Sequence, residues 1–452
     1  MVTLFYTKIH NEFFIFLGVA LHYTIYQIKI KESELKMSIT GIISEYNPFH
    51  NGHKYLIQKH KENFPDSYFI AVMSGNFTQR GEIALVDKWQ RAKLAVANGI
   101  DLVIELPFVF AVRSAQYFAK GGIDLLHKLH CVDTICFGSE YTNEKELTFI
   151  AQTSQSEKFQ QMLKNKLADG QSYAAVTSEV LSNLTNISED ILKAPNTILG
   201  IEYLKANLNL EKPLTVNIIQ RMKAEHNNLN YQENFASGTA IRHSLYTNNS
   251  NFSKLKQVVP DETYFVLQEI HQAQDLPHLD YLFTNLISKL RLAKLDELTK
   301  IYGIREGLEY KLLKTANEAI NLQDFFQKLK SKRYPLTNLQ RLTLYLLLNI
   351  TKDLIQRFDD TGALYARVLA FNDKGTELLK QMKKNASIPI ITKTTSYLDS
   401  KKRCQQKLTT FEEMLAIDTY ATELYNLCFN PFKPYGKDFT TSPYYFKTNN
   451  EN

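Results

Sequence analysis

Cysteine is scarce in this sequence, with four residues among 452. The four, Cys131, Cys136, Cys404 and Cys428, are too few and too scattered to form a disulfide framework. The first two lie near each other, but no second pair follows, so their spacing argues against a zinc ribbon. We therefore predict no metal site and a reducing compartment, the cytoplasm.

A strong excess of one charge is also lacking, because 53 Lys and Arg stand against 47 Asp and Glu, a net charge of +6. This mildly basic balance permits nucleic-acid binding without requiring it. A hydrophobic content of 44% and a charged content of 22% are typical of globular proteins. The length indicates two or three domains.

The apolar run at the N-terminus, Phe13–Tyr26, is short for a membrane span, which needs about 20 residues. Lys8 alone makes a weak basic start, and no small-residue cleavage site follows, which argues against a signal peptide. We expect the folded protein to begin near Met37, with residues 1–36 a disordered extension or an upstream mis-start. A membrane or export segment is the alternative.

Short apolar segments rich in β-branched residues alternate with helical patterns from Met37 onward. The predicted strands are Ile39–Tyr46, Tyr68–Met73, Asp101–Leu106, Asp133–Phe137 and Leu214–Ile219. Helical spacing covers 51–63, 87–98, 114–129 and about 145–207. Strands that are apolar on both faces and separated by helices predict an α/β fold with a doubly wound parallel sheet.

The pattern changes after about residue 250, where long helical stretches dominate. They are Tyr281–Ala293, Tyr310–Leu329 and Leu339–Phe358, followed by a short strand at Ile388–Ile391. We therefore predict an extension over 1–36, an α/β domain over 37–250, and a mostly helical domain over 251–452.

The segment Gly41–Tyr55 has the features of a phosphate-binding site. A buried strand ends at Glu45, an Asn-Pro turn follows, and HNGH, from His50 to His53, opens a helix. Doubly wound sheets bind anions where a helix N-terminus meets the carboxyl end of a strand. Gly52 allows a ligand to approach the backbone closely. The alternatives are two surface histidines or zinc ligands, although no third ligand is evident.

A second segment, FASGTAIR, ends at Arg242 and by itself is a capped helix start. Together with HNGH, it resembles the S-x-T-x-I-R signature of the HxGH nucleotidyltransferase superfamily, which is related to class I aminoacyl-tRNA synthetases. The resemblance implies that Ser237, Thr239 and Arg242 hold the β- and γ-phosphates of ATP.

A longer series of motifs narrows the resemblance. In order, the chain contains SEYNPFHNGHKY, GNFTQRGEIALVDKWQRA, DLVIELPFVFAVRSAQYFAKGGI, FGSE, APNTILGIEYLKA, IIQRMKAEHN, FASGTAIR, REGLEYKL, KRYPLTNLQR and SIPIITK. From Met37 to about residue 440 it closely resembles the bacterial tRNA(Met) cytidine acetate ligases. That family forms acetyl-adenylate from acetate and ATP and transfers the acetyl group to N4 of the wobble cytidine of elongator tRNA(Met), without acetyl-CoA.

The resemblance also implies site residues. The catalytic pair is His50 and His53, which stabilise charge on the α-phosphate and the leaving group. The ATP-binding residues are Ile43, Ser44, Glu45, Tyr46, Asn47, Pro48, Phe49, His50, Asn51, Gly52, His53, Lys54, Tyr55, Leu56, Gly138, Asn196, Arg221, Thr239 and Arg242. Mg²⁺ is expected with ATP, although no carboxylate pair indicates where it binds.

Three of these residues also have ordinary structural interpretations. Gly138 and Arg221 end predicted strands, so they could be a strand-end glycine and a solvated charge. Asn196 follows Pro195 and could be a helix N-cap. In the GNFTQRGE segment, Arg80 could approach the phosphates or the tRNA, or belong to a turn stabilised by Asn76. The following Asp87, Lys88 and Arg91 could form an ion pair.

Basic residues in the second half are candidates for tRNA contacts, because lysine and arginine supply salt-dependent affinity for phosphates. We assign this role to Lys332, Arg333, Arg341 and Arg367, with Lys328, Lys330 and the Lys380–Lys384 cluster as neighbours. Asn338 stands where the family pattern has an arginine. A solvated helix face is the alternative for each.

Two other functions remain open. A nucleotidyltransferase could adenylylate a small phosphorylated metabolite, but such enzymes are usually far shorter. A non-catalytic RNA-binding protein could keep the fold alone, but intact HNGH and SGTAIR argue against it. No membrane partner is expected.

Overall fold

The computed structural model describes residues 38–167, 173–222, 234–247, 252–305, 307–405 and 407–447. The prediction about residues 1–36 lies outside this part of the chain. Among the described residues, no helix has both the length and the apolar character needed to cross a membrane. The elements below all belong to one unit, residues 39–452.

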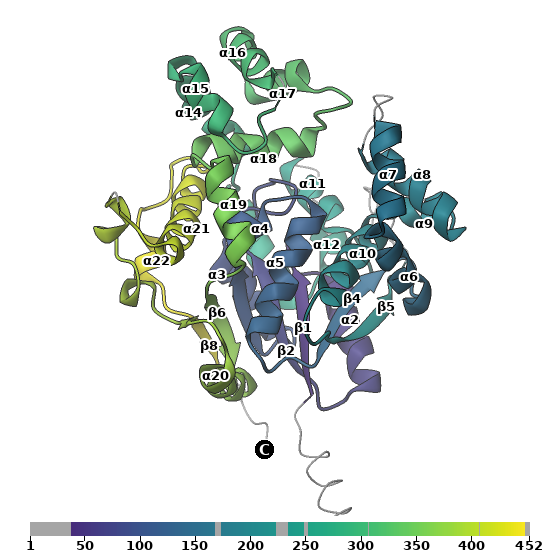
Figure 1. Cartoon of the computed structure of the whole chain (residues 1–452). Coiled ribbons are helices and arrows are strands. Elements are labelled where there is room, and N and C mark those ends of the chain that lie inside the picture. The colour runs from purple at the N-terminus through teal and green to yellow at the C-terminus, as the bar shows by residue number, and fades with distance from the viewer. Residues whose placement is uncertain are drawn as a thin grey trace, which may run out of the picture. The chain divides into compact units, whose positions relative to one another are not determined.

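A mixed sheet runs through this unit (Figure 1). Its strands are β1 (Ile39–Ser44), β2 (Tyr68–Ser74), β3 (Leu102–Leu106), β4 (Thr134–Ser139), β5 (Thr215–Gln220), β6 (Ala366–Asn372), β7 (Ile390–Ile391) and β8 (Tyr444–Phe446). They lie in the order β5-β4-β1-β2-β3-β6-β7, and β8 pairs with β6. Strands β1 to β5 are parallel and correspond to the five predicted strands, so the doubly wound parallel sheet is confirmed.

The strand order creates a switch point beside β1. The chain adds β2 and β3 on one side of β1 and then β4 and β5 on the other. The loops after β1 and β4 therefore leave in opposite directions and open a crevice at the carboxyl ends of these strands, where α/β sheets bind their ligands. The HNGH segment follows β1 and lies at this crevice.

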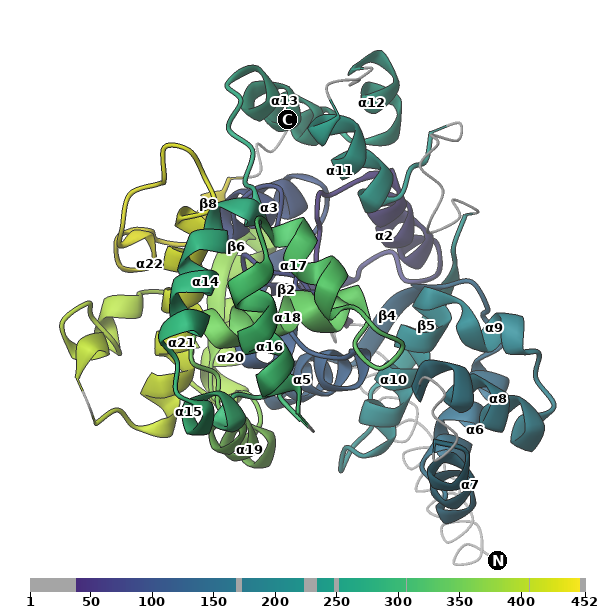
Figure 2. The ribbon, with the colours of Figure 1, turned by 90° about the horizontal axis from the view of Figure 1, so that it is seen from above.

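Helices cover both faces of the parallel strands. Figure 2 shows α2 (Asn51–Asn63) and α3 (Lys88–Ala97) on one face and α5 (Ala115–Lys128) and α10 (Pro195–Leu208) on the other. The first three match their predicted ranges within one residue at each end. The predicted helical stretch over 145–207 is a series of separate helices, namely α6 (Glu144–Ser154), α7 (Glu157–Leu167), α8 (Tyr173–Thr185), α9 (Glu189–Lys193) and α10.

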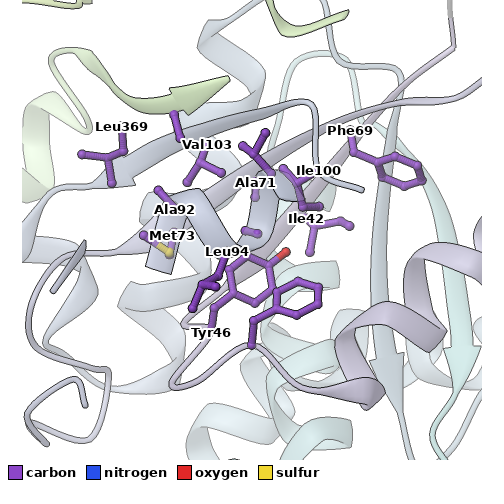
Figure 3. Close-up of a cluster of buried hydrophobic side chains, with 14 of the residues drawn as sticks. Ile42, Tyr46, Phe69, Ala71, Met73, Ala92, Leu94, Ile100, Val103 and Leu369 are labelled. Atoms are coloured by element: carbon purple, nitrogen blue, oxygen red, sulfur yellow. The ribbon is translucent and has the colours of Figure 1, made fainter. Parts of the chain in front are cut away.

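The core between the sheet and α3 explains why these segments form strands and a helix. Ile42, Ala71 and Val103 are register partners on three neighbouring strands and point to the same face, because pairing residues share a side of the pleat (Figure 3). Leu94 of α3 packs against them. The helix begins at Asp87, whose carboxylate accepts a hydrogen bond from the Gln90 N–H at 2.9 Å.

The remaining helices include α4 after β3 and a group after β5. They are α4 (Phe108–Ala111), α11 (Gly238–Tyr246), α12 (Phe252–Val258), α13 (Asp261–Gln272), η1 (Leu279–Leu282), α14 (Phe283–Leu292), α15 (Leu295–Lys300), α16 (Leu308–Glu318), α17 (Leu322–Leu329), α18 (Leu336–Leu347), α19 (Lys352–Thr361), α20 (Asp373–Asn385), η2 (Thr394–Ser396), η3 (Lys402–Cys404), α21 (Thr410–Asn426) and α22 (Lys437–Thr440).

Two predicted long helices are each divided in two. Tyr310–Leu329 becomes α16 and α17, and Leu339–Phe358 becomes α18 and α19. Each second helix has its own cap, because the side chain of Asn321 accepts from the Asp324 N–H at 2.8 Å and that of Thr351 from Leu354 at 3.2 Å. Both caps are polar residues that the apolar periodicity does not detect.

The sequence analysis missed β6. This strand pairs antiparallel with β3, and β7 and β8 pair with it, so the second half of the chain extends the same sheet. The predicted boundary near residue 250 therefore does not separate an α/β part from a helical part. The helical group α14–α18 lies at the end of the sheet where the parallel strands finish (Figure 1).

Candidate active site

The loop after β1 has an unusual backbone. Tyr46 adopts φ of 46°, in the left-handed region that residues with a side chain rarely occupy, and the Asn47–Pro48 peptide is cis. The Tyr46 ring is 2% exposed and packs against Phe49 and His53, with ring centroids 5.0 and 4.9 Å away. The Asn47 side chain accepts a hydrogen bond from the Leu85 N–H at 2.8 Å. These contacts determine how the HNGH segment enters α2.

The two histidines cap α2 together. His50 is the N-cap, and its Nδ1 accepts from the Gly52 N–H at 3.1 Å. His53 Nδ1 in turn accepts from the His50 N–H at 3.2 Å. The rings stack with centroids 3.8 Å apart and 17° between planes. Because each Nδ1 is an acceptor, the proton of each neutral ring lies on Nε2, the nitrogen that can donate to a ligand.

The protonation of His53 follows from its surroundings. Burial lowers its pKa well below the usual range, and His50 and Arg221 lower the pKa further. His53 is therefore a neutral hydrogen-bond donor at pH 7. A neutral N–H donor of this kind can stabilise a phosphate oxygen without a permanent positive charge.

A cavity at the crevice brings together residues from three strand ends. Of the predicted ATP-binding residues, the lining contains His50, Gly52, Tyr55, Leu56, Gly138 and Arg221. It also contains residues that the sequence analysis did not assign, which are Ile219, Gln220, Met222, Phe235 and Ala236. Only their position could have indicated them, because they end or closely follow the predicted fifth strand or directly precede SGTAIR.

Gly138 leaves room for the side chain of Arg221. A Cβ at this position would lie 3.2 Å from Arg221 Cγ and 3.5 Å from Leu56 Cδ1. Burial lowers the pKa of Arg221, and nearby Glu140 opposes this effect. The glycine and the arginine thus face each other at the ends of β4 and β5 and line the same cavity.

Asn196 is placed differently from the N-cap alternative. Ala194 is the N-cap of α10, and Asn196 is the second residue of the helix. Its side chain donates to Glu140 Oε1 at 2.5 Å, and the Thr197 N–H donates to Glu140 Oε2 at 2.8 Å. Burial raises the pKa of Glu140, but these hydrogen bonds outweigh it and hold the pKa below its usual range. Asn196 thus faces the FGSE segment at the end of β4.

The two signature segments meet in space. Arg242 Nη1 donates to the Asn47 carbonyl at 2.8 Å, and Nη2 lies 2.6 Å from Glu82 Oε2 and 3.4 Å from Thr239 Oγ1. Ser237 is the N-cap of α11 and accepts from the Ala240 N–H. The start of α11 and the loop after β1 therefore present their donors to the same region.

The segment between β2 and α3 supports this site. Asn76 accepts from the Lys88 N–H at 2.8 Å and its carbonyl accepts from Ala84, which fits the predicted turn stabilised by Asn76. Arg80 is partly buried. Asp87 and Lys88 do form ion pairs, with Lys437 and Asp438 of the C-terminal segment, and Lys88 also pairs with Glu105 of β3. Arg91 binds backbone carbonyls instead.

The predicted tRNA-contact residues divide into two groups. Lys332 and Arg333 are exposed between α17 and α18, and Arg341 of α18 donates to the Gln79 carbonyl at 3.1 Å. Arg367 is a correction, because it is 3% exposed and ion-paired with Asp438 at 2.5 Å and with Glu105 at 3.2 Å. A side chain inside the core cannot reach a nucleic acid.

The Lys380–Lys384 cluster also differs from its prediction. It lies on α20, which follows the end of β6 that pairs with the start of β3. This is the edge of the sheet opposite the carboxyl ends of the parallel strands (Figure 1). The cluster therefore does not belong to the surface around the crevice.

No group of three or more His, Cys, Asp or Glu side chains among the described residues is arranged to hold a metal ion. The cysteines of the described part have no disulfide partners, and burial raises the pKa of Cys136 to about 12. Glu82 places one carboxylate beside Arg242, where it could join phosphate oxygens around a Mg²⁺ ion.

Comparisons with known proteins agree with this geometry. The family model described as HIGH Nucleotidyl Transferase matches residues 37–438. The tRNA(Met) cytidine acetate ligase of Thermoanaerobacter sp. (strain X514) is 39% identical over 407 residues, 89% of this chain and 98% of that protein. The protein of the same name from Alkaliphilus metalliredigens (strain QYMF) is 36% identical over 429 residues, 91% of this chain and 99% of that protein.

Solved structures give the same answer. The crystal structure of Thermotoga maritima TmcAL (apo, form I) superposes with a TM-score of 0.83 at 31% identity, covering 91% of this chain and 100% of that chain. The same protein bound with alpha-thio ATP superposes with a TM-score of 0.81 at 31% identity, with equal coverage. The chain therefore belongs to the HIGH nucleotidyltransferase family and, within it, to the tRNA(Met) cytidine acetate ligases.

Proposed function

We infer that this protein is an ATP-dependent ligase that forms acetyl-adenylate from acetate and ATP and transfers the acetyl group to N4 of the wobble cytidine of elongator tRNA(Met). The observation that carries this proposal is the meeting of the loop after β1 with the start of α11 at the crevice, through Arg242 and Asn47. Family membership supplies the reaction. Acetyl-CoA has no part in it, and we expect the protein in the cytoplasm.

The first step needs positioning and charge stabilisation more than covalent help. A carboxylate oxygen of acetate attacks the α-phosphorus while the bond from that phosphorus to pyrophosphate breaks. We assign the Nε2–H groups of His50 and His53 to the α-phosphate and the leaving oxygen. Because both rings are fixed by their Nδ1 hydrogen bonds, they need no rearrangement as charge develops.

We assign the binding of the leaving pyrophosphate to the SGTAIR segment at the start of α11. Thr239 lies in the first turn of α11, whose backbone N–H groups favour anions, and the Arg242 side chain extends toward Thr239. Arg221 adds a cation from the end of β5. We expect Mg²⁺ to arrive with ATP and to neutralise phosphate charge, with Glu82 as the protein carboxylate nearest Arg242.

In the second step the N4 amine of cytidine attacks the acetyl carbonyl, AMP leaves with the electrons of the carbon–oxygen bond, and the nitrogen gives up one proton to solvent. The mixed anhydride is reactive enough that we assign no general base. We propose that Lys332, Arg333 and Arg341 bind tRNA phosphates, since α18 contacts the segment after β2 that also contacts the loop after β1.

Exchange of labelled pyrophosphate into ATP tests the first step. Exchange should require acetate and be lost in His53→Ala, because the α-phosphate loses a donor. His127→Ala is the matched control, since this histidine lies in the last turn of α5, toward the other edge of the sheet, and should leave exchange intact. Exchange that requires a phosphorylated metabolite in place of acetate would favour a metabolite nucleotidyltransferase. A protein that binds tRNA but shows no exchange, whether or not tRNA is added, would favour a non-catalytic RNA-binding protein.

A further inference from the structure

We propose that Arg91 is a positioning residue that holds the ATP loop, residues 43–56, in the conformation that binds ATP. It does so by donating hydrogen bonds to backbone carbonyl groups at the ends of β1 and β2. The proposal rests on the proposed function only in taking this loop as the ATP site. The hydrogen bonds of Arg91 go to backbone carbonyls, and Arg91 is not part of the cavity lining, so we do not assign it a catalytic role.

The guanidinium of Arg91 is fully buried, and its hydrogen bonds go to backbone carbonyls. Nη1 donates to the carbonyl of Glu45 at 2.6 Å and to that of Ser74 at 3.1 Å. Nη2 donates to Gly75, and Nε donates to Val86 at 3.0 Å. One side chain therefore joins the end of β1, the end of β2 and the segment that leads into α3.

The contact with Glu45 matters most, because the strained residue of the loop comes directly after it. The Glu45 carbonyl belongs to the planar peptide group that joins Glu45 to Tyr46. A hydrogen bond to this carbonyl therefore fixes the orientation of the peptide plane, and the φ of Tyr46 is the rotation relative to that plane. That φ is 46°, a value that a tyrosine leaves unless its surroundings hold it there. Arg91 is thus bonded to the peptide that begins the strained turn into HNGH.

Other contacts fasten the same turn from the segment after β2. Gln79 donates its N–H to Glu45 Oε1 at 2.6 Å, and Leu85 donates to the Asn47 side chain. Arg91 holds the two ends of this segment, at Gly75 and Val86. Arg91 therefore acts on the ATP loop directly, through the Glu45 carbonyl, and indirectly, through the segment from Gly75 to Val86.

The planar fork of arginine suits this task, and lysine does not. A guanidinium has donors that diverge in one plane and can reach carbonyls on separate strands, whereas an ammonium is a single point. The neighbouring Lys88 shows the contrast, because it is equally buried on the same helix but binds the carboxylates of Glu105 and Asp438. Neither of these partners belongs to the ATP loop.

The test compares Arg91→Lys and Arg91→Met with Lys88→Met. Calorimetric titration with ATP alone measures Kd, so the result does not depend on the acetate reaction. We expect Arg91→Lys to raise the Kd of ATP at least tenfold and Arg91→Met to raise it more. Lys88→Met should lower Tm but leave the Kd of ATP within twofold of wild type, because it removes stability without touching the loop.

A second measurement isolates the strained turn. Glycine adopts positive φ without steric cost, so in a Tyr46→Gly background the turn needs less support. Adding Arg91→Lys should then raise the Kd of ATP by a smaller factor than it does in the wild type. If Arg91→Lys raised the Kd of ATP by the same factor in both backgrounds, the proposed link to Tyr46 would be wrong.

Two further results would overturn the proposal. One is an Arg91→Lys protein that folds and binds ATP as the wild type does. The other is an Arg91→Lys protein that does not fold while Lys88→Met does, since the residue would then serve the whole fold and not this loop. A wild-type protein that binds ATP but shows no acetate-dependent exchange would contradict the proposed function without contradicting the proposal about Arg91.

Discussion

Removing Arg242 should weaken ATP binding more than it weakens the fold. The side chain is 17% exposed at the start of α11, where it donates to the Asn47 carbonyl at 2.8 Å and pairs with Glu82 at 2.6 Å. Both contacts are to polar groups that we assign to the ATP site. In Arg242→Ala, the carboxylate of Glu82 stays beside the phosphates of ATP without its partner.

The magnitude follows from the chemistry of the contact. A hydrogen bond to a charged group contributes about 1.5–3 kcal/mol, so the loss predicts a Kd for ATP about 10- to 150-fold higher. A partly exposed ion pair contributes at most about 1 kcal/mol to folding, so Tm should fall by only a few degrees. Arg242→Lys should be intermediate, because an ammonium retains the charge but cannot serve both Asn47 and Glu82.

The assay is calorimetric titration of ATP, with Tm measured on the same samples. Arg357→Ala is the matched control, since Arg357 forms a pair with Glu413 at 2.7 Å, on the surface between α19 and α21. It should leave the Kd of ATP unchanged. A folded Arg242→Ala protein with wild-type Kd would refute the assignment of the SGTAIR segment to phosphate binding.

Other predictions address tRNA, the core and pH. Lys332→Ala combined with Arg333→Ala should weaken tRNA binding and reduce its salt slope by about one to two, with the Kd of ATP unchanged; an unaltered salt slope in filter binding would contradict this. Arg367→Met should destabilise the fold by roughly 3 kcal/mol, because two buried carboxylates then share one cation, Lys88, while the folded protein should bind tRNA as the wild type does. Weaker tRNA binding by that folded protein would restore the original assignment. Burial lowers the pKa of His60 to about 4, so below about pH 6.5 the unfolded chain binds a proton that the folded protein excludes. The free energy of unfolding should therefore fall by roughly 1–2 kcal/mol from pH 7 to pH 5, and urea unfolding should show a smaller fall in His60→Gln.

Much of the fold could be predicted because its signals are local. The helix predicted over Asn51–Asn63 has those bounds in the structure. The five parallel strands carried their own β-branched runs, most of them followed by a Gly or Pro within two residues, and burial on both faces left few alternatives to a doubly wound sheet. The two long helices that proved divided show the limit, since Asn321 and Thr351 end an apolar pattern that otherwise continues.

The sequence by itself also indicated which segments we propose for ATP binding. HNGH follows a buried strand and opens a helix, which predicts a phosphate-binding helix start. SGTAIR by itself predicts only a capped helix start, and its proposed role depends on the family resemblance. Gly138 and Arg221 were found as strand ends, and strand ends of a parallel sheet share one edge. The residues that complete the cavity, such as Phe235 and Met222, have no chemical signature of their own.

Only the tertiary structure decided what depends on partners far along the chain. No local pattern indicates that β6 pairs with β3, or that Arg367 and Lys88 share the buried carboxylates of Glu105 and Asp438. A basic residue in a buried network and one on a tRNA-binding surface look alike in sequence, because charge is local and burial is not. The same holds for Arg91, whose role follows from three chain segments that meet at one guanidinium.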